Sequence, residues 1–132
     1  FNEKNIGETV LNLINENLVE SVHDVSLGGI IVAITKMCIR GNKGIKIGKF
    51  KNLINKFEYL FGEDQGRYIL EINKSNLSKI KEILVNNSVH FDEIGVLVNN
   101  SIEIDGEFIF QLEDLKKEYK KWLKEYMLLS WQ

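Results

Sequence analysis

Apolar residues recur at steps of three and four along much of the chain, which is the spacing of amphipathic helices. The clearest stripe combines Leu77, Ile80, Ile83 and Leu84, with Ser75 or Asn76 available as the N-cap. Gly41 is expected to end the helix predicted over residues 30–39, since glycine often follows a helix end. The spacing predicts helices over residues 7–17, 30–39, 50–60, 77–85 and 112–126.

Short runs rich in β-branched and aromatic residues predict strands between these helices. The predicted strands cover residues 19–25, 44–47, 67–72, 91–98, 101–104 and 107–110. Asp105-Gly106 is a favoured hairpin pair, so the last three strands are expected to form a small antiparallel sheet. Helices and strands interleave without strict βαβ alternation, which predicts an α+β fold. We expect one domain over residues 1–132, with a mixed, largely antiparallel sheet packed with helices in an α/β sandwich.

Composition narrows the class of protein without naming a function. The chain has 132 residues, 44% of them hydrophobic, and a net charge of −2, which predicts no general attraction to nucleic acid. No apolar run approaches the roughly 20 residues that span a bilayer, so no membrane partner is expected. The single cysteine, Cys38, fits a reducing cytoplasm and is expected to be a buried, inert thiol. The start at Phe1 is interpreted as a cut in a longer chain.

Basic residues are concentrated in one stretch of the sequence. Residues 25–57 contain seven Lys or Arg and no acidic residue. This stretch is either a solvated face whose acids lie elsewhere or a patch facing phosphate or a partner.

A first candidate site lies where the strand over 19–25 meets the next helix. The strand ends near Asp24 and continues through Ser26 and Gly28-Gly29, and backbone N–H groups at a helix start attract anions such as phosphate. Asp24 could then hold Mg²⁺ together with phosphate oxygens, and His23 could donate a hydrogen bond. In the simpler interpretation, Asp24 or Ser26 caps the helix and the glycines form a turn.

A second candidate site precedes the strand over 67–72. Glu63, Asp64, Gln65 and Arg67 place two carboxylates, an amide and a guanidinium close to two glycines. These groups either line a polar ligand site or form a solvated turn with an internal ion pair. The sequence has no zinc-ligand spacing, no P-loop and no dinucleotide-binding glycine pattern.

The two segments together resemble a known superfamily. Residues 21–30 read Ser-Val-His-Asp-Val-Ser-Leu-Gly-Gly-Ile and residues 61–68 read Phe-Gly-Glu-Asp-Gln-Gly-Arg-Tyr. Both are similar to the C-terminal domain of aminoimidazole ribonucleotide synthetase-like proteins, and most similar to subunit II of phosphoribosylformylglycinamidine synthases. The resemblance runs over nearly the whole chain. One departure is Leu27, where an acidic residue is usual.

The resemblance implies a domain of a longer, multi-domain, cytoplasmic ligase in purine biosynthesis. Such an enzyme uses ATP and Mg²⁺, with ADP as product, to phosphorylate the amide oxygen of formylglycinamide ribonucleotide, after which ammonia displaces phosphate. The implied partners are the remaining domains of the same chain, a glutaminase subunit and a small accessory subunit. The isolated piece is expected to hold no catalytic residue, to need no cofactor and to be inactive.

The resemblance also implies which residues of this chain face a ligand. Asp24 is the implied Mg²⁺ ligand. The implied ligand-binding residues are His23, Ser26, Gly28, Gly29, Glu63, Asp64, Gln65 and Arg67. Another enzyme of the superfamily, or a structural domain without ligand, remains the alternative.

Overall fold

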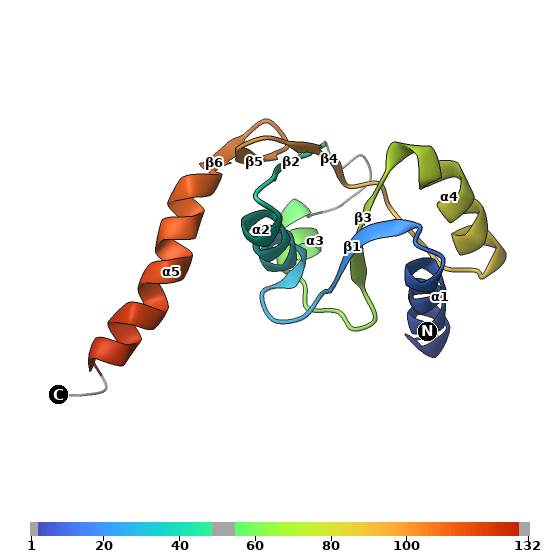
Figure 1. Cartoon of the computed structure of the whole chain (residues 1–132), viewed down its shortest axis with the longest axis horizontal. Coiled ribbons are helices and arrows are strands. Elements are labelled where there is room, and N and C mark those ends of the chain that lie inside the picture. The colour runs from blue at the N-terminus through green and yellow to red at the C-terminus, as the bar shows by residue number, and fades with distance from the viewer. Residues whose placement is uncertain (1–2, 49–54, 130–132) are drawn as a thin grey trace. The chain divides into compact units, whose positions relative to one another are not determined.

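The computed structural model describes residues 3–48 and 55–129, and these residues form two compact units (Figure 1). The first unit contains residues 3–34 and 55–93, and the second contains residues 35–48 and 94–129. The boundary between them falls within one helix, α2. The elements that begin in the first unit are α1 (Glu3–Asn15), β1 (Val19–Asp24), α2 (Gly29–Gly41), α3 (Lys56–Phe61), β3 (Tyr68–Ile72), the 3₁₀ turn η1 (Lys74–Asn76) and α4 (Leu77–Asn86). Those of the second unit are β2 (Gly44–Ile47), β4 (Gly95–Val98), β5 (Ser101–Ile104), β6 (Phe108–Gln111) and α5 (Leu112–Leu129).

The first unit combines a two-stranded sheet with helices. Strands β1 and β3 pair antiparallel, with Asp24 opposite Tyr68 at the end of β1. This pairing brings the segment after β1 beside the segment before β3. The two segments singled out in the sequence are therefore neighbours, although about 40 residues separate them along the chain.

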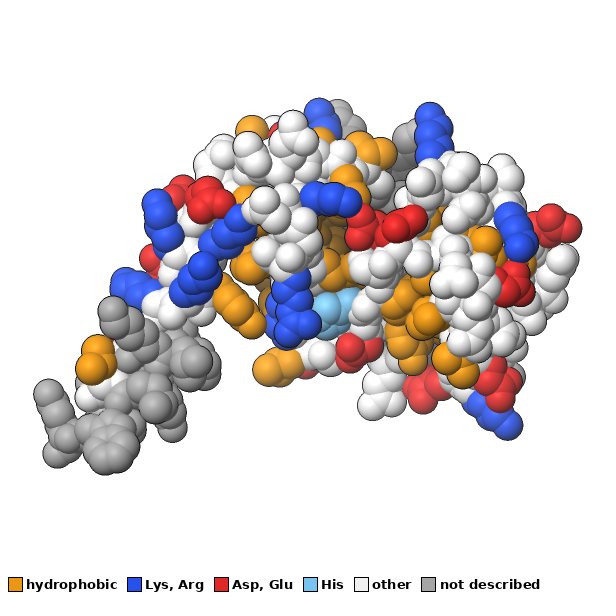
Figure 2. Space-filling model, viewed as in Figure 1, with side chains coloured by type: hydrophobic (Ala, Val, Ile, Leu, Met, Phe, Trp, Pro, Cys, Tyr) orange, Lys and Arg blue, Asp and Glu red, His pale blue; other side chains and the backbone are white. Residues whose placement is uncertain are grey.

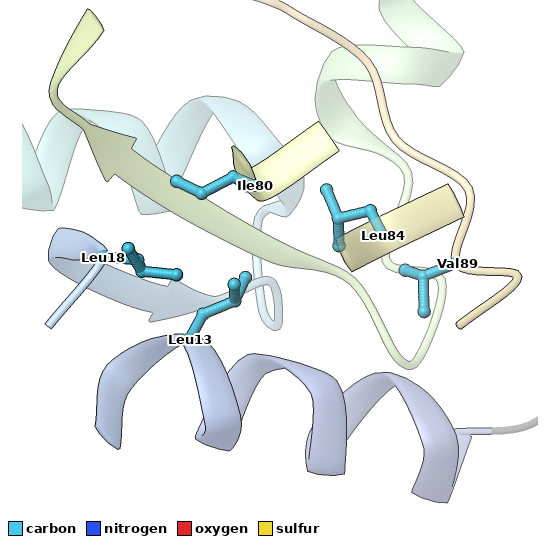
Figure 3. Close-up of a cluster of buried hydrophobic side chains, with 5 residues drawn as sticks. All are labelled: Leu13, Leu18, Ile80, Leu84 and Val89. Carbon is cyan, nitrogen blue, oxygen red and sulfur yellow. The ribbon is translucent and has the colours of Figure 1, made fainter. Parts of the chain in front are cut away.

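A hydrophobic cluster joins α1 and α4 in the first unit (Figure 3). Its buried members are Leu13, Leu18, Ile80, Leu84 and Val89. Partly buried side chains of β1 and β3 pack against it, including Leu70 and Ile72. The cluster fixes the backbone of the sheet from which the two candidate segments extend.

Three helices end in the same way, with a non-glycine residue in the left-handed conformation. These residues are Asn17, Asn42 and Ser88, with φ of 53°, 52° and 55°. In each case the N–H of the following residue donates to the carbonyl five residues before it, at 2.8–3.2 Å, as in a Schellman motif. The prediction that Gly41 closes α2 was therefore wrong, because the helix includes Gly41 and Asn42 makes the turn.

The second unit contains a four-stranded mixed sheet in the order β4-β2-β5-β6. β2 pairs antiparallel with β4 and parallel with β5, and β5 pairs antiparallel with β6. The expected pairing of β4 with β5 was wrong, because β2 lies between them, whereas the antiparallel pairing of β5 with β6 is confirmed. A Cβ on Gly44 would lie 2.0 Å from the carbonyl oxygen of Ser101, so only glycine fits where the first residue of β5 lies beside the start of β2.

The predicted elements are otherwise largely confirmed, including the α+β class with mostly antiparallel pairing. Residues 91–94 are not part of a strand, contrary to the prediction for 91–98. Asn76 is the N-cap residue of α4, as expected, but makes no side-chain capping hydrogen bond. The side-chain cap belongs to the preceding turn η1, where Asn73 Oδ1 accepts from the N–H of Ser75 at 3.1 Å. Residues 50–54 of the helix predicted over 50–60 lie outside the described residues, and the described part forms α3.

The predicted hairpin at Asp105-Gly106 and the predicted burial of Cys38 are both confirmed. Asp105 and Gly106 both have positive φ, and the N–H of Glu107 donates to the carbonyl of Ile104 at 3.0 Å. The Cys38 side chain is buried. Among the described residues, the structure contains no helix long and apolar enough to cross a membrane.

Candidate functional site

The turn after β1 depends on two consecutive glycines with left-handed backbone. Gly28 has a φ of 85° and Gly29, the first residue of α2, has a φ of 71°. Other residue types are strained in this region of backbone space. The N–H of Gly29 donates to the carbonyl of Ser26 at 3.0 Å, which closes the turn immediately before the helix.

The start of α2 also lies against the end of α3. A Cβ on Gly29 would lie 2.6 Å from the carbonyl oxygen of Leu60 and 2.7 Å from the carbonyl carbon of Phe61. These are backbone atoms in a helix whose Leu60 side chain is buried, so they cannot move aside cheaply. The glycine therefore permits direct contact between the two candidate segments.

Glu63 supplies a carboxylate to the turn. Its Oε1 accepts a hydrogen bond from the backbone N–H of Gly28 at 2.7 Å. A charge-assisted bond of this length is among the stronger hydrogen bonds in proteins. The anion-attracting position suggested by the sequence is thus occupied by a side chain of the second segment.

Arg67 holds the rest of the second segment in place. Its guanidinium donates to the carbonyl of Gly62 and lies 3.3 Å from the Asp64 carboxylate. The N–H of Val25 donates to the Arg67 carbonyl at 2.9 Å, which continues the connection between the two segments beyond the sheet. This geometry is that of an exposed turn with an internal ion pair, which is one of the two interpretations of the segment.

His23 and Asp24 interact with each other. The His23 Nδ1 lies 2.6 Å from the Asp24 carbonyl oxygen, and since a carbonyl only accepts, this contact places a hydrogen on Nδ1. The same nitrogen is 3.5 Å from the Asp24 carboxylate, which is itself mostly exposed. Within the described part of the chain, no hydrogen bond or ion pair joins either side chain to Glu63, Asp64 or Arg67.

Tyr59 belongs to the same surroundings and was missed in the sequence. Burial raises the pKa of its phenol, and the Asp92 carboxylate raises the pKa further, while the Arg67 guanidinium opposes the rise. A tyrosine on an otherwise weakly patterned helix gives no sequence signal for this environment.

The described residues do not form a metal site by themselves. Residues 3–48 and 55–129 contain no group of three or more His, Cys, Asp or Glu placed to hold a metal ion. Asp24 offers a single exposed carboxylate, whereas Mg²⁺ needs several oxygen ligands in octahedral arrangement. Ser26 and Gln65 are exposed, and so is Leu27, at the position where the resemblance implies an acid.

Comparison with known proteins assigns the chain to a family. Residues 1–106 match the family described as AIR synthase related protein, C-terminal domain. The chain belongs to this family. The resemblance carried by residues 21–30 and 61–68 is therefore confirmed.

Curated relatives of this C-terminal domain extend the match to almost the whole chain. The chain is 55% identical over 127 residues to phosphoribosylformylglycinamidine synthase subunit PurL of Pelagibacter ubique, with 96% of this chain and 17% of that protein covered. It is 38% identical over 125 residues to the subunit of the same name from Bartonella henselae, with 95% and 17% covered. The chain thus spans 17% of the length of these relatives.

Solved structures show the same fold for an AIR synthase related C-terminal domain. Thermotoga maritima PurL complexed with FGAR matches with a TM-score of 0.75 and 21% identity, over 88% of this chain and 21% of that one. The same protein complexed with ATP matches with a TM-score of 0.73 and 20% identity, over 86% of this chain and 21% of that one. The α+β architecture expected from the sequence is confirmed by this likeness.

Proposed function

We propose that this chain is one domain of an ATP-dependent ligase that converts formylglycinamide ribonucleotide to formylglycinamidine ribonucleotide in purine biosynthesis. The observation that carries the proposal is the 55% identity, over 96% of the chain, to a phosphoribosylformylglycinamidine synthase subunit. Similarity at that level, over both candidate segments and the C-terminal helix, favours a shared role over a shared fold alone.

In the proposed reaction, the amide oxygen of the substrate attacks the γ-phosphorus of ATP and ADP leaves. Ammonia then adds at the activated carbon, and inorganic phosphate departs with that oxygen to leave the amidine. This chemistry depends on groups that position phosphates and stabilise their charge. We assign that work to the remaining domains of a longer chain, so the domain described here is inactive when isolated.

Cofactors and partners follow from the same proposal. The whole enzyme uses ATP and Mg²⁺ in the cytoplasm, and receives ammonia from a glutaminase subunit in a complex that also contains a small accessory subunit. When bound, Mg²⁺ neutralises phosphate charge. Asp24 serves as its ligand only if phosphate oxygens and groups beyond the described residues complete the coordination.

Exposed apolar side chains in the second unit support the presence of neighbouring domains. Phe108, Ile109 and Phe110 of the edge strand β6 are all exposed, with Ile109 at 62%. At the opposite edge, Val96 and Leu97 of β4 are also exposed. Figure 2 shows hydrophobic side chains open at the surface of the chain. Apolar side chains gathered on sheet edges are typical of surfaces that another domain covers.

The proposal is tested with the full coding sequence of the gene. We expect it to encode two ATP-binding-type domains before this one, and we expect the purified product to form ADP from ATP only when formylglycinamide ribonucleotide and an ammonium salt are both present. Ammonium replaces the glutaminase, so the assay needs no partner subunit. The 132-residue chain assayed beside it should form no ADP. A full-length product without substrate-dependent ADP formation, or activity of the 132-residue chain by itself, contradicts the proposal.

One observation favours a second candidate, a domain that packs without contacting any ligand. The Glu63 carboxylate already occupies the Gly28 N–H, which is where the sequence suggests a phosphate. In that case, alanine substitution of the exposed Ser26 or Gln65 leaves the KM for ATP and for formylglycinamide ribonucleotide unchanged in the full-length enzyme. A rise in either KM supports ligand contact instead.

A further inference from the structure

We propose that the Glu63 carboxylate is a permanent anion at the start of α2. It closes this position to phosphate and holds residues 21–30 and 61–68 together. The inference concerns this domain alone and holds whichever reaction the whole enzyme performs.

The start of α2 favours a negative charge. Its backbone N–H groups point away from the helix and its dipole is positive at this end. The adjacent sequence offers one acid, Asp24, whose carboxylate lies 3.5 Å from His23 Nδ1, and residues 25–57 contain none, with leucine at position 27. A carboxylate has to come from elsewhere in the chain, or an external anion has to bind.

The second segment provides that carboxylate in a defined way. Of its two acids, Asp64 is 3.3 Å from the Arg67 guanidinium. Glu63 accepts from the Gly28 N–H at 2.7 Å, and within the described part of the chain it has no ion-pair partner. The two neighbouring acids therefore have separate roles, one neutralised locally by arginine and the other facing the helix start.

The backbone around Glu63 is held so that this contact is maintained. Gly29 lies directly against the backbone of residues 60–61, and the Val25 N–H donates to the Arg67 carbonyl at 2.9 Å. These contacts lie on either side of the Gly28–Glu63 hydrogen bond. Glu63 is thus presented to the turn by a fixed backbone rather than by a free loop.

A phosphate at the same N–H would meet the Glu63 carboxylate at close range. The two anions repel each other, and Gly28 has a single hydrogen to donate. Removing the carboxylate should therefore convert the turn into an anion-binding position for inorganic phosphate.

The test is hydrogen–deuterium exchange with mass spectrometry on the intact protein, following the peptide that contains residues 26–30. In Glu63→Ala we expect exchange in this peptide to rise about tenfold, the size expected for loss of a hydrogen bond to a charged group. Millimolar inorganic phosphate should restore protection in Glu63→Ala and leave wild type unchanged. Asp64→Ala is the matched control, because it removes the adjacent carboxylate and should leave exchange at residues 26–30 near the wild-type rate.

Several results would overturn the proposal. They are unchanged exchange in Glu63→Ala, an equal effect of Asp64→Ala, failure of phosphate to restore protection, or protection of wild type by phosphate. If Glu63→Ala loses protection in α4 as well and is therefore unfolded, Glu63→Gln carries the test. It keeps the shape of the side chain without the charge, and exchange equal to wild type in that variant would likewise overturn the proposal.

Discussion

Substituting alanine for Gly29 tests the contact on which the paired segments depend. The new Cβ would lie 2.6 Å from the Leu60 carbonyl oxygen and 2.7 Å from the Phe61 carbonyl carbon, closer than real Cβ atoms approach such atoms. The residue would also have to keep a φ of 71°, which disfavours any residue with a Cβ. The two effects add, because one acts within the residue and the other between segments.

The free-energy cost of each effect can be separated by comparison with another glycine of the same unit. A left-handed backbone costs a non-glycine residue about 1–2 kcal/mol. Forcing packed backbone apart adds about 1–3 kcal/mol, so we expect Gly29→Ala to lower the free energy of unfolding by about 2–5 kcal/mol. Gly66 has a φ of 73° but faces only the flexible Glu3 side chain, so Gly66→Ala should show the first effect alone. Gly7 lies inside α1, and a Cβ added there would meet the Tyr68 hydroxyl at an ordinary contact distance of 3.8 Å, so Gly7→Ala should stabilise the protein by about 0.5–1 kcal/mol.

The assay is urea unfolding followed by far-UV circular dichroism, with the three variants compared at a common slope. The decisive quantity is the difference in unfolding free energy between Gly29→Ala and Gly66→Ala, which isolates the close approach of residues 60–61 to the start of α2. If the two variants lose the same free energy, the segments are not in contact as described, and the reasoning from Gly29 is refuted.

Two further predictions concern the same unit. Leu13 is completely buried in the cluster of Figure 3, so Leu13→Ala should lower the free energy of unfolding by about 2–5 kcal/mol, whereas Leu11→Ala at an exposed position should cost less than about 1 kcal/mol. Similar losses in urea unfolding would contradict this core. Burial raises the folded-state pKa of Tyr59, so its contribution to stability is complete below the unfolded pKa of about 10 and is lost as pH rises through the folded value. Tyr59→Phe should therefore weaken the alkaline decline in stability, and an unchanged pH profile between about pH 9 and pH 12 would argue against the burial.

Local signals in the sequence predicted most elements, because helix periodicity and turn chemistry act within a few residues. The α1, α2, α4 and α5 helices and the Asp105-Gly106 hairpin all follow from such signals. Helix ends were less accessible, because Asn42 rather than Gly41 adopts the left-handed conformation. Asparagine adopts that conformation more readily than most residues with a Cβ, so residue type does not decide between adjacent candidates.

Strand order was beyond local reasoning for a different physical reason. The short strands β4 and β5 follow each other after only two residues, a spacing that suggests a hairpin. Instead both pair with β2, which comes from more than 40 residues earlier. The pairing partner of a four-residue strand depends on tertiary packing. Gly44 permits the close approach of β5 to β2, and its significance appears only once Ser101 lies against it.

The candidate site shows the same division between residue type and role. Residue types alone predicted that the helix start after Gly28-Gly29 attracts an anion, but they did not predict that Glu63 of the acidic segment lies there. They did not predict which anion occupies the turn, since a carboxylate from the protein and a phosphate from a ligand satisfy the same N–H. Which anion binds there depends on β1–β3 pairing, which brings the two segments together, and on Arg67. Arg67 forms an ion pair with Asp64, and the Glu63 carboxylate accepts the hydrogen bond from the turn. A family motif at such a turn therefore identifies a backbone geometry, and the position of the nearest unpaired carboxylate decides whether that geometry binds a ligand or holds two parts of the domain together.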